Sequence, residues 1–410
     1  MKGICLVLIL LISGGAAGAV PAGEALWPPG RGPRVALLNP ALLGYPAPTN
    51  FGLELPSTGA LVSNNSFSVG FWNSRIAGDG FWDAAEVREI LDRIPAHGLE
   101  MQAQLAATIL GVRYKQWAFN AELLGAGRIR VPKDIAEIAL LGTRLNESYE
   151  LSDLIGGSFA IAQYSLGFGH PVKQNIVPDL NAGIALHYYQ GLVLAKVDEP
   201  QGNLYITDDL IEGSAAFRGG YGFHGQGIGV DVGLASVLSP RWQVGLVCRQ
   251  IGATIAWNLE ETTEKRFEAG LAGIALDSLD DEGYLDRALN EYSNTTKGGR
   301  ATLRLPVTLQ ATAMFVPNSR WSFTGEIGCY TQASPLGKAG GEMGTAAIFH
   351  PKRWAILQGG VVLGGPHRNL FMLGTGLRFS HYELDLEFLT RGLFRSTHGV
   401  GVGISQRVFF

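Results

Sequence analysis

Charged side chains alternate with large apolar ones near the end of this sequence. Glu383, Asp385 and Glu387 are separated by single residues, and apolar side chains fill the positions around them, namely Tyr382, Leu384, Leu386 and Phe388. A period of two is typical of a β-strand whose two faces meet different surroundings. Carboxylates need water or cations, and the same alternation predicts four inward arginines, Arg113, Arg249, Arg378 and Arg407. These residues predict a network of ion pairs in a wet interior, without selection for one sign of charge.

Motifs for catalysis or cofactor binding are absent from the sequence. It has no G-x-S-x-G, H-E-x-x-H or phosphate-binding glycine motif, and its eight histidines stand singly. The acidic run from Asp277 to Asp286 lacks the spacing of a calcium loop and predicts a solvated helix. A net charge of -4 leaves no basic excess for nucleic acid. We expect no enzyme, no cofactor and no metal site; the alternative is a hydrolase with an unrecognised Ser and His.

The final segment, residues 398–410, indicates what the apolar faces contact. Val400, Val402 and Ile404 fall on one parity, the glycines between them fall on the other, and the chain ends at Phe410. This is the pattern of a membrane strand with a lipid face and a lumen face. A strand in a bilayer must pair all its backbone groups, so one such strand implies a closed barrel. The alternative is the edge strand of a soluble sandwich.

The amino terminus predicts export. Lys2 is followed by an apolar run from Ile4 to Ile12 and by small residues that end at Ala19. A short apolar core between a positive charge and an A-x-A site is the layout of a cleaved secretory signal. We expect residues 1–19 to be removed near Ala19, and the mature chain to reach the outer membrane of a diderm bacterium.

Strand patterns and turns together predict an all-β membrane protein, an antiparallel transmembrane β-barrel of about 14 strands over residues 61–410. Short polar turns precede four tryptophans that suit a membrane boundary, Trp117, Trp242, Trp321 and Trp354. If these turns are periplasmic, parity places the first strand near 61–72 and four extracellular loops near 73–102, 131–156, 198–225 and 258–302. Residues 20–60 are rich in proline, which predicts an irregular plug inside the lumen.

Two of the expected loops contain helical patterns. The first places Phe81, Val87, Ile90, Leu91 and Ile94 near one face, and the second carries Ile135 and Ile138. The apolar faces can pack on each other and on the barrel rim, or they can form a groove for a hydrophobic ligand. Burial of Ile90 and Leu91 against the rim would count against the groove, and an open cavity beside them would favour it.

Short motifs resemble a known group of barrels. Residues 38–43 read Leu-Asn-Pro-Ala-Leu-Leu, and glycine-rich segments follow at 164–169, 183–191 and 227–233. Asn39, Pro40 and Ala41 resemble the N-P-A signature of barrels similar to the long-chain fatty-acid transporter and to the type IX secretion shuttle. The resemblance implies an uncharacterised outer-membrane family with fourteen strands and an N-terminal plug.

The resemblance leaves two functions open. The first is a barrel that binds a hydrophobic small molecule or passes it across the outer membrane. The second is a surface barrel that does not transport and serves protein interaction or secretion. In either case the expected partners are outer-membrane lipid and, through the strand that ends at Phe410, the barrel assembly machinery.

Overall fold

The structure is a computed structural model that describes residues 32–410 except 47–48, 78–81, 145, 151, 153, 207–209, 273–288, 332–338, 366–368 and 394–395. The expected signal peptide, the acidic run from Asp277 to Asp286 and Phe81 therefore lie outside the described residues, and the predictions for them stay predictions. Among the described residues, no helix has the length and apolar character needed to cross a membrane.

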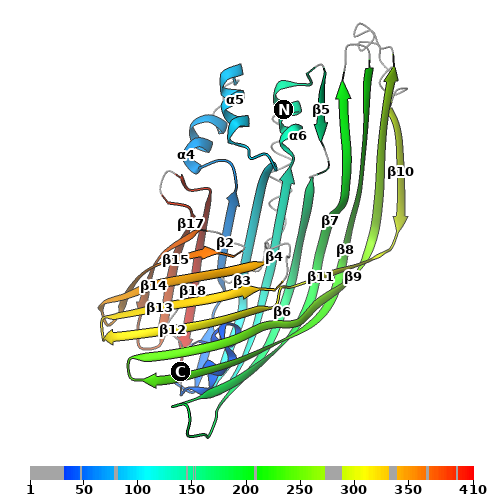
Figure 1. The fold of residues 1–410 in the computed structure, drawn as a ribbon. Coiled ribbons are helices and arrows are strands. Elements are labelled where there is room, and N and C mark those ends of the chain that lie inside the picture. The colour runs from blue at the N-terminus through cyan, green and yellow to red at the C-terminus, as the bar shows by residue number, and fades with distance from the viewer. Residues whose placement is uncertain are drawn as a thin grey trace.

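Fourteen antiparallel strands form a closed ring (Figure 1). In ring order they are β2 (Ser57–Asn64), β3 (Leu99–Tyr114), β4 (Trp117–Val131), β6 (Ile155–Pro171), β7 (Asn181–Ile206), β8 (Leu210–Ser239), β9 (Trp242–Ala272), β12 (Thr308–Asn318), β13 (Trp321–Tyr330), β14 (Gly340–Lys352), β15 (Ala355–Gly364), β16 (Leu370–Arg378), β17 (Tyr382–Arg391) and β18 (Gly399–Phe409). Pairing of β18 with β2, with Gly403 opposite Gly59, closes the ring. The predicted fold class is confirmed.

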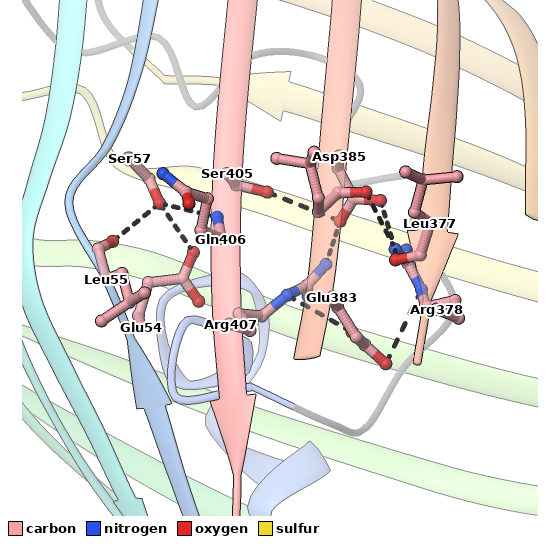
Figure 2. A network of polar contacts seen from close by, with 11 residues as sticks. Glu54, Leu55, Ser57, Leu377, Arg378, Glu383, Asp385, Ser405, Gln406 and Arg407 are labelled. Carbon is pink, nitrogen blue, oxygen red and sulfur yellow. Dashed lines mark hydrogen bonds and ion pairs between the residues drawn. The ribbon is translucent and has the colours of Figure 1, made fainter. Parts of the chain in front are cut away.

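The first wall strand begins earlier than predicted. β1 (Phe51–Glu54) pairs with β18 and β3 on the same path as β2, so residues 51–60 lie mainly in the wall and the assignment of a plug through residue 60 is wrong. Pro56 lacks an N–H and interrupts the ladder between β1 and β2. Ser57 Oγ bridges the gap by accepting from the Gln406 N–H at 3.2 Å (Figure 2). The predicted strand at 61–72 is also wrong at its end, because residues 69–76 are helical.

Two expected loops are long hairpins. Residues 198–225 and 258–302 largely continue β7, β8 and β9, with β10 (Leu289–Lys297) and β11 (Arg300–Arg304) as further partners of β9. β5 (Glu147–Glu150) adds to the side of β7. Polar cross-strand pairs suit a ladder in water, as where Tyr221 donates to Glu261 at 3.1 Å. The strands within the second segment, residues 258–302, were not predicted from the sequence, which is polar on both of their faces.

The two ends of the barrel differ. We call the end with the short turns and the C-terminus the short-turn end, and the opposite end the helical end (Figure 1). At the short-turn end, Trp117, Trp242 and Trp321 start their strands and pack with tilted rings against phenylalanines of neighbouring strands, with ring centroids 4.5 to 4.7 Å apart. Trp354 directly precedes β15 and is half exposed. The tryptophans occupy the positions that the turns predicted.

Short helices cover the helical end. They are α4 (Val69–Phe71), the π-helix η2 (Trp72–Ile76), α5 (Ala84–Arg93) and α6 (Lys133–Leu141). α5 begins at a capping box, in which Asp83 accepts from the Glu86 N–H and the Glu86 side chain accepts from the Asp83 N–H. The two longer helices lie where the periodicity of apolar residues predicted them.

Candidate functional site

An N-terminal plug docks on a wall of glycines inside the short-turn end. It consists of α3 (Val35–Leu38) and the 3-10 helix η1 (Pro40–Gly44), and η1 contacts β6, β7 and β8. A Cβ added at Gly169 would lie 2.5 Å from the Pro40 carbonyl oxygen, and Gly183 and Gly233 leave equally little space beside Pro40 and Asn39. Only glycine permits this approach of backbone to backbone. The glycine-rich motifs therefore form the receptor surface of the N-P-A segment.

Polar groups fix the plug in register. Asn39 Oδ1 accepts from the Ala41 N–H at 3.0 Å, and Asn39 Nδ2 donates to the Leu234 and Leu246 carbonyls at 3.0 and 3.4 Å. The buried Arg113 donates to the Tyr45 carbonyl at 3.0 Å. Asn39 thus starts η1 and ties it to β8 and β9 at once, while Pro40 takes the first helical position, where no N–H is needed.

Four of the predicted charges form a closed square on β16, β17 and β18 (Figure 2). Arg378 lies 2.6 Å from Asp385 Oδ1 and 3.6 Å from Glu383, and Arg407 contacts the second oxygen of each carboxylate, with 3.5 Å to Glu383. Both carboxylates are buried. Each buried charge in the square has two neighbours of opposite charge. The square therefore links the three strands in one fixed geometry.

The square faces the plug across a cavity of about 670 Å³. Glu387 lines this cavity together with Arg34 of the plug segment and Lys352 of the β14 turn. Arg249 is not part of the square, because it lies on β9 within electrostatic range of Glu326 and Glu342. The structure therefore divides the predicted network into two separate groups.

A buried polar chain crosses the middle of the wall. His187 Nδ1 lies 2.7 Å from Ser165 Oγ, and His187 Nε2 lies 3.0 Å from Asp231 Oδ2. Gln163 donates to the same Ser165 oxygen at 3.0 Å. Sequence reasoning missed this cluster, although its members share the inward parity of adjacent strands. Ser165 is fully buried, and these polar contacts link β6, β7 and β8.

Apolar side chains line the inner wall between the polar chain and the helical end. We call the group on β4, β6, β7, β9 and β11 the large arc; it contains Ala126, Phe159, Ile161, Tyr189, Leu194, Ala253, Ile255, Trp257, Leu259, Ala301, Leu303 and Leu305. A small arc on β2 and β14–β17 contains Leu61, Ala346, Val362, Leu370, Met372 and Leu389. These positions have the inward parity of the charged residues below them on the same strands. A lumen filled by water alone does not require such a lining.

The helices at the helical end bury the residues predicted to form a groove. Val87, Ile90, Leu91 and Ile94 are buried in one cluster with Phe67 and Phe71, and Ala136, Leu140 and Leu141 of α6 pack on it. Ile135 and Ile138 are half-buried and lie outside this cluster. Ile90 and Leu91 thus pack at the rim, which counts against an open groove at α5. A ligand groove at these residues stays a prediction.

Comparison with known proteins gives a family of unknown function and a fold. Residues 40–216 match the family of unknown function DUF5723. Comparison with curated proteins yields no match. The P. putida toluene transporter TodX superposes with a TM-score of 0.55 at 11% identity, over 96% of this chain and 99% of TodX. A Pseudomonas aeruginosa FadL homologue gives a TM-score of 0.50 at 12% identity, over 97% of this chain and 98% of the homologue.

These likenesses define the class. The chain is an outer-membrane type β-barrel with the fold of FadL-family hydrocarbon channels, and it resembles an uncharacterised group within that fold. The resemblance found in the sequence is confirmed at this level. At 11 to 12% identity the likeness extends to the fold alone.

Proposed function

We propose that the protein passes a hydrophobic small molecule across the outer membrane. The observation that carries the proposal is the apolar lining of the inner wall, the large and small arcs. Apolar surface inside a barrel suits a hydrophobic guest, because transfer of such a guest from water to an apolar wall is favourable. The fold shared with the P. putida toluene transporter TodX supports the same class of cargo.

In this proposal the helical end faces outside. The molecule enters beneath α5 and α6, crosses the two arcs, and meets the polar chain and the plug near the short-turn end. Phe410 is exposed at that end, where the barrel assembly machinery would bind the last strand. Outer-membrane lipid covers the outward apolar residues, which include Leu186, Leu246 and Leu373.

A charge placed in the large arc tests the proposal. Cells that lack the gene and carry wild type, Leu303→Asp or Leu303→Met are compared for influx of the hydrophobic dye N-phenyl-1-naphthylamine. Leu303 is buried in the large arc, so a carboxylate there repels an apolar guest, and methionine keeps the lining apolar. We expect influx at the level of empty cells for Leu303→Asp and near wild type for Leu303→Met. Equal dye influx in cells with wild type and in empty cells would exclude the proposal, provided that the barrel is present and folded.

A second candidate is a surface barrel whose hairpins dock a protein. The burial of Ile90 and Leu91 favours it, because the cap offers no open groove at α5. The extended strands of β7, β8, β9 and β10 would supply the docking surface. Stoichiometric co-purification of a surface or periplasmic partner, lost when residues 261–297 are replaced by a short turn, would support this candidate. Intact dye influx in the same variant would assign transport and docking to separate parts.

A further inference from the structure

Two hydrogen-bond donors in the large arc have no partner. The side chains of Tyr189 and Trp257 are 0% and 1% exposed. Among the described residues, nothing accepts a hydrogen bond from the Tyr189 hydroxyl or the Trp257 Nε1. Folded proteins pair almost all buried polar groups, because an unpaired donor that leaves water loses a hydrogen bond that no protein group replaces. Phenylalanine would fill the same space at either position without that loss.

The barrel wall is shaped around both rings. The Trp257 indole lies over Gly191 of β7 and Gly225 of β8, where an added Cβ at Gly225 would be 2.5 Å from Cδ2. The Tyr189 hydroxyl lies 3.2 Å from the Cβ position of Gly229, four residues farther along β8. The two donors therefore occupy two levels of one apolar surface. Glycines that make room for an indole and a phenol are signs of a built site.

The apolar side chains packed with these rings offer no acceptor, and the polar neighbour of Tyr189, the His187 ring at 6.0 Å, already has Ser165 and Asp231 as partners. Phe159, Ile161, Leu194, Ile255 and Leu303 belong to the same cluster and are entirely hydrocarbon. Binding sites for small molecules combine such a lining with a few polar groups that fix the orientation of the ligand. An isolated donor in such a lining selects a ligand that brings an acceptor.

We infer that the large arc binds an apolar molecule that carries a carbonyl oxygen, such as a ketone or an ester, in preference to a plain hydrocarbon. This inference rests on the proposed function and names its substrate class. A carbonyl that enters the arc accepts from Tyr189 or Trp257, whereas a hydrocarbon leaves both donors buried and unsatisfied. Sites built to hydrogen-bond a ligand discriminate strongly against analogues that lack the matching group.

A matched pair of probes tests the inference. 2-Undecanone and 2-methyl-1-undecene differ only in a C=O against a C=CH₂ group, and each is used in radiolabelled form. Equilibrium binding is measured to the full chain in lipid nanodiscs, with empty nanodiscs as the reference, so that partition into lipid cancels. For wild type we expect about tenfold tighter binding of the ketone.

The variants assign the preference to the two donors. Tyr189→Phe with Trp257→Phe keeps both rings and removes both donors, so the ketone should fall to the affinity of the alkene while the alkene is unchanged. Trp242→Phe is the control, because that indole lies at the short-turn end against Phe315. Equal binding of ketone and alkene to wild type, or a preference that persists in the double variant, overturns the inference and leaves the proposed function in place. No binding of either probe above empty nanodiscs overturns both.

Discussion

The two ends of the lumen are closed by contacts of opposite kinds. At the short-turn end, Asn39 and Pro40 approach the backbone of a glycine wall, and Arg378 and Arg407 lie in a square with two carboxylates. At the helical end, most contacts are apolar side chains of the arcs and of the α5 cluster, beside one buried ion-pair group of Glu100 with Arg128 and Arg130. Hydrogen bonds and ion pairs hold one geometry, whereas apolar contacts have little directional preference. The comparison teaches that the helical end can repack around a guest more readily than the short-turn end.

Removal of one cation from the square should give the largest loss of stability. Arg407→Met leaves Glu383 and Asp385 buried with half of their cationic partners, and we expect the free energy of unfolding to fall by about 3–5 kcal/mol. Guanidinium titration of the folded barrel in detergent measures the loss. Replacement of all four members by Met or Leu is the matched control and should be close to neutral, since no charge is then left buried. A small loss of unfolding free energy for Arg407→Met alone would show that water in the cavity already solvates the square.

The α5 cluster should respond to loss of packing. Ile90→Ala removes buried methyl groups beside Phe67 and Phe71, and we expect a local loss of about 2–4 kcal/mol. Hydrogen exchange of the α5 amides measures this loss without global unfolding.

Ile135→Ala is the control for the cap, because Ile135 is half-buried and lies outside the cluster. Its effect should be less than half as large. Equal protection losses in the two variants would mean that α6 buries Ile135 in solution, and would restore the groove as a shared surface of both helices.

The fold was predictable from the sequence because polar and apolar residues alternate along membrane strands. Glu383, Asp385 and Leu386 show both faces of β17 plainly, and the turn tryptophans fix the ends of the strands. The strands within residues 258–302 were missed because both of their faces meet water, which removes the contrast between alternate residues. β1 was missed because Pro56 interrupts the ladder between it and β2.

The site was predictable only in part. Inward parity found the members of the square, but it could not say which of them meet, and Arg249 belongs to another group. The N-P-A segment was found from the sequence. The glycines that receive it were found only as motifs, and their contact with the plug was not predicted. The sequence placed Tyr189 only within a glycine-rich motif and did not single out Trp257, because a missing hydrogen-bond partner is a property of the packed structure.

A single methyl group on the glycine wall should displace the plug. Gly183→Ala places its Cβ against the Pro40 backbone, which has no space for it, so we expect a cost of about 1–3 kcal/mol in plug docking. Conductance in planar bilayers should rise, because the plug no longer closes the short-turn end. Gly325→Ala is the matched control, since its nearest neighbour, the Gly344 carbonyl oxygen, lies 4.0 Å away. Unchanged conductance in Gly183→Ala would mean that the lumen is closed elsewhere.

Loss of the Asn39 side chain should weaken the same docking by a smaller amount. Asn39→Ala removes donors to the Leu234 and Leu246 carbonyls and the acceptor for the Ala41 N–H, and we expect about 1–2 kcal/mol and a smaller rise in conductance. The double variant with Gly183→Ala decides whether both act on one contact. If Gly183→Ala already lifts η1 from the wall, Asn39 has little left to lose, and the two effects add to less than their sum. Full additivity would mean that the Asn39 hydrogen bonds and the glycine wall hold the plug through independent contacts, so that neither depends on the other.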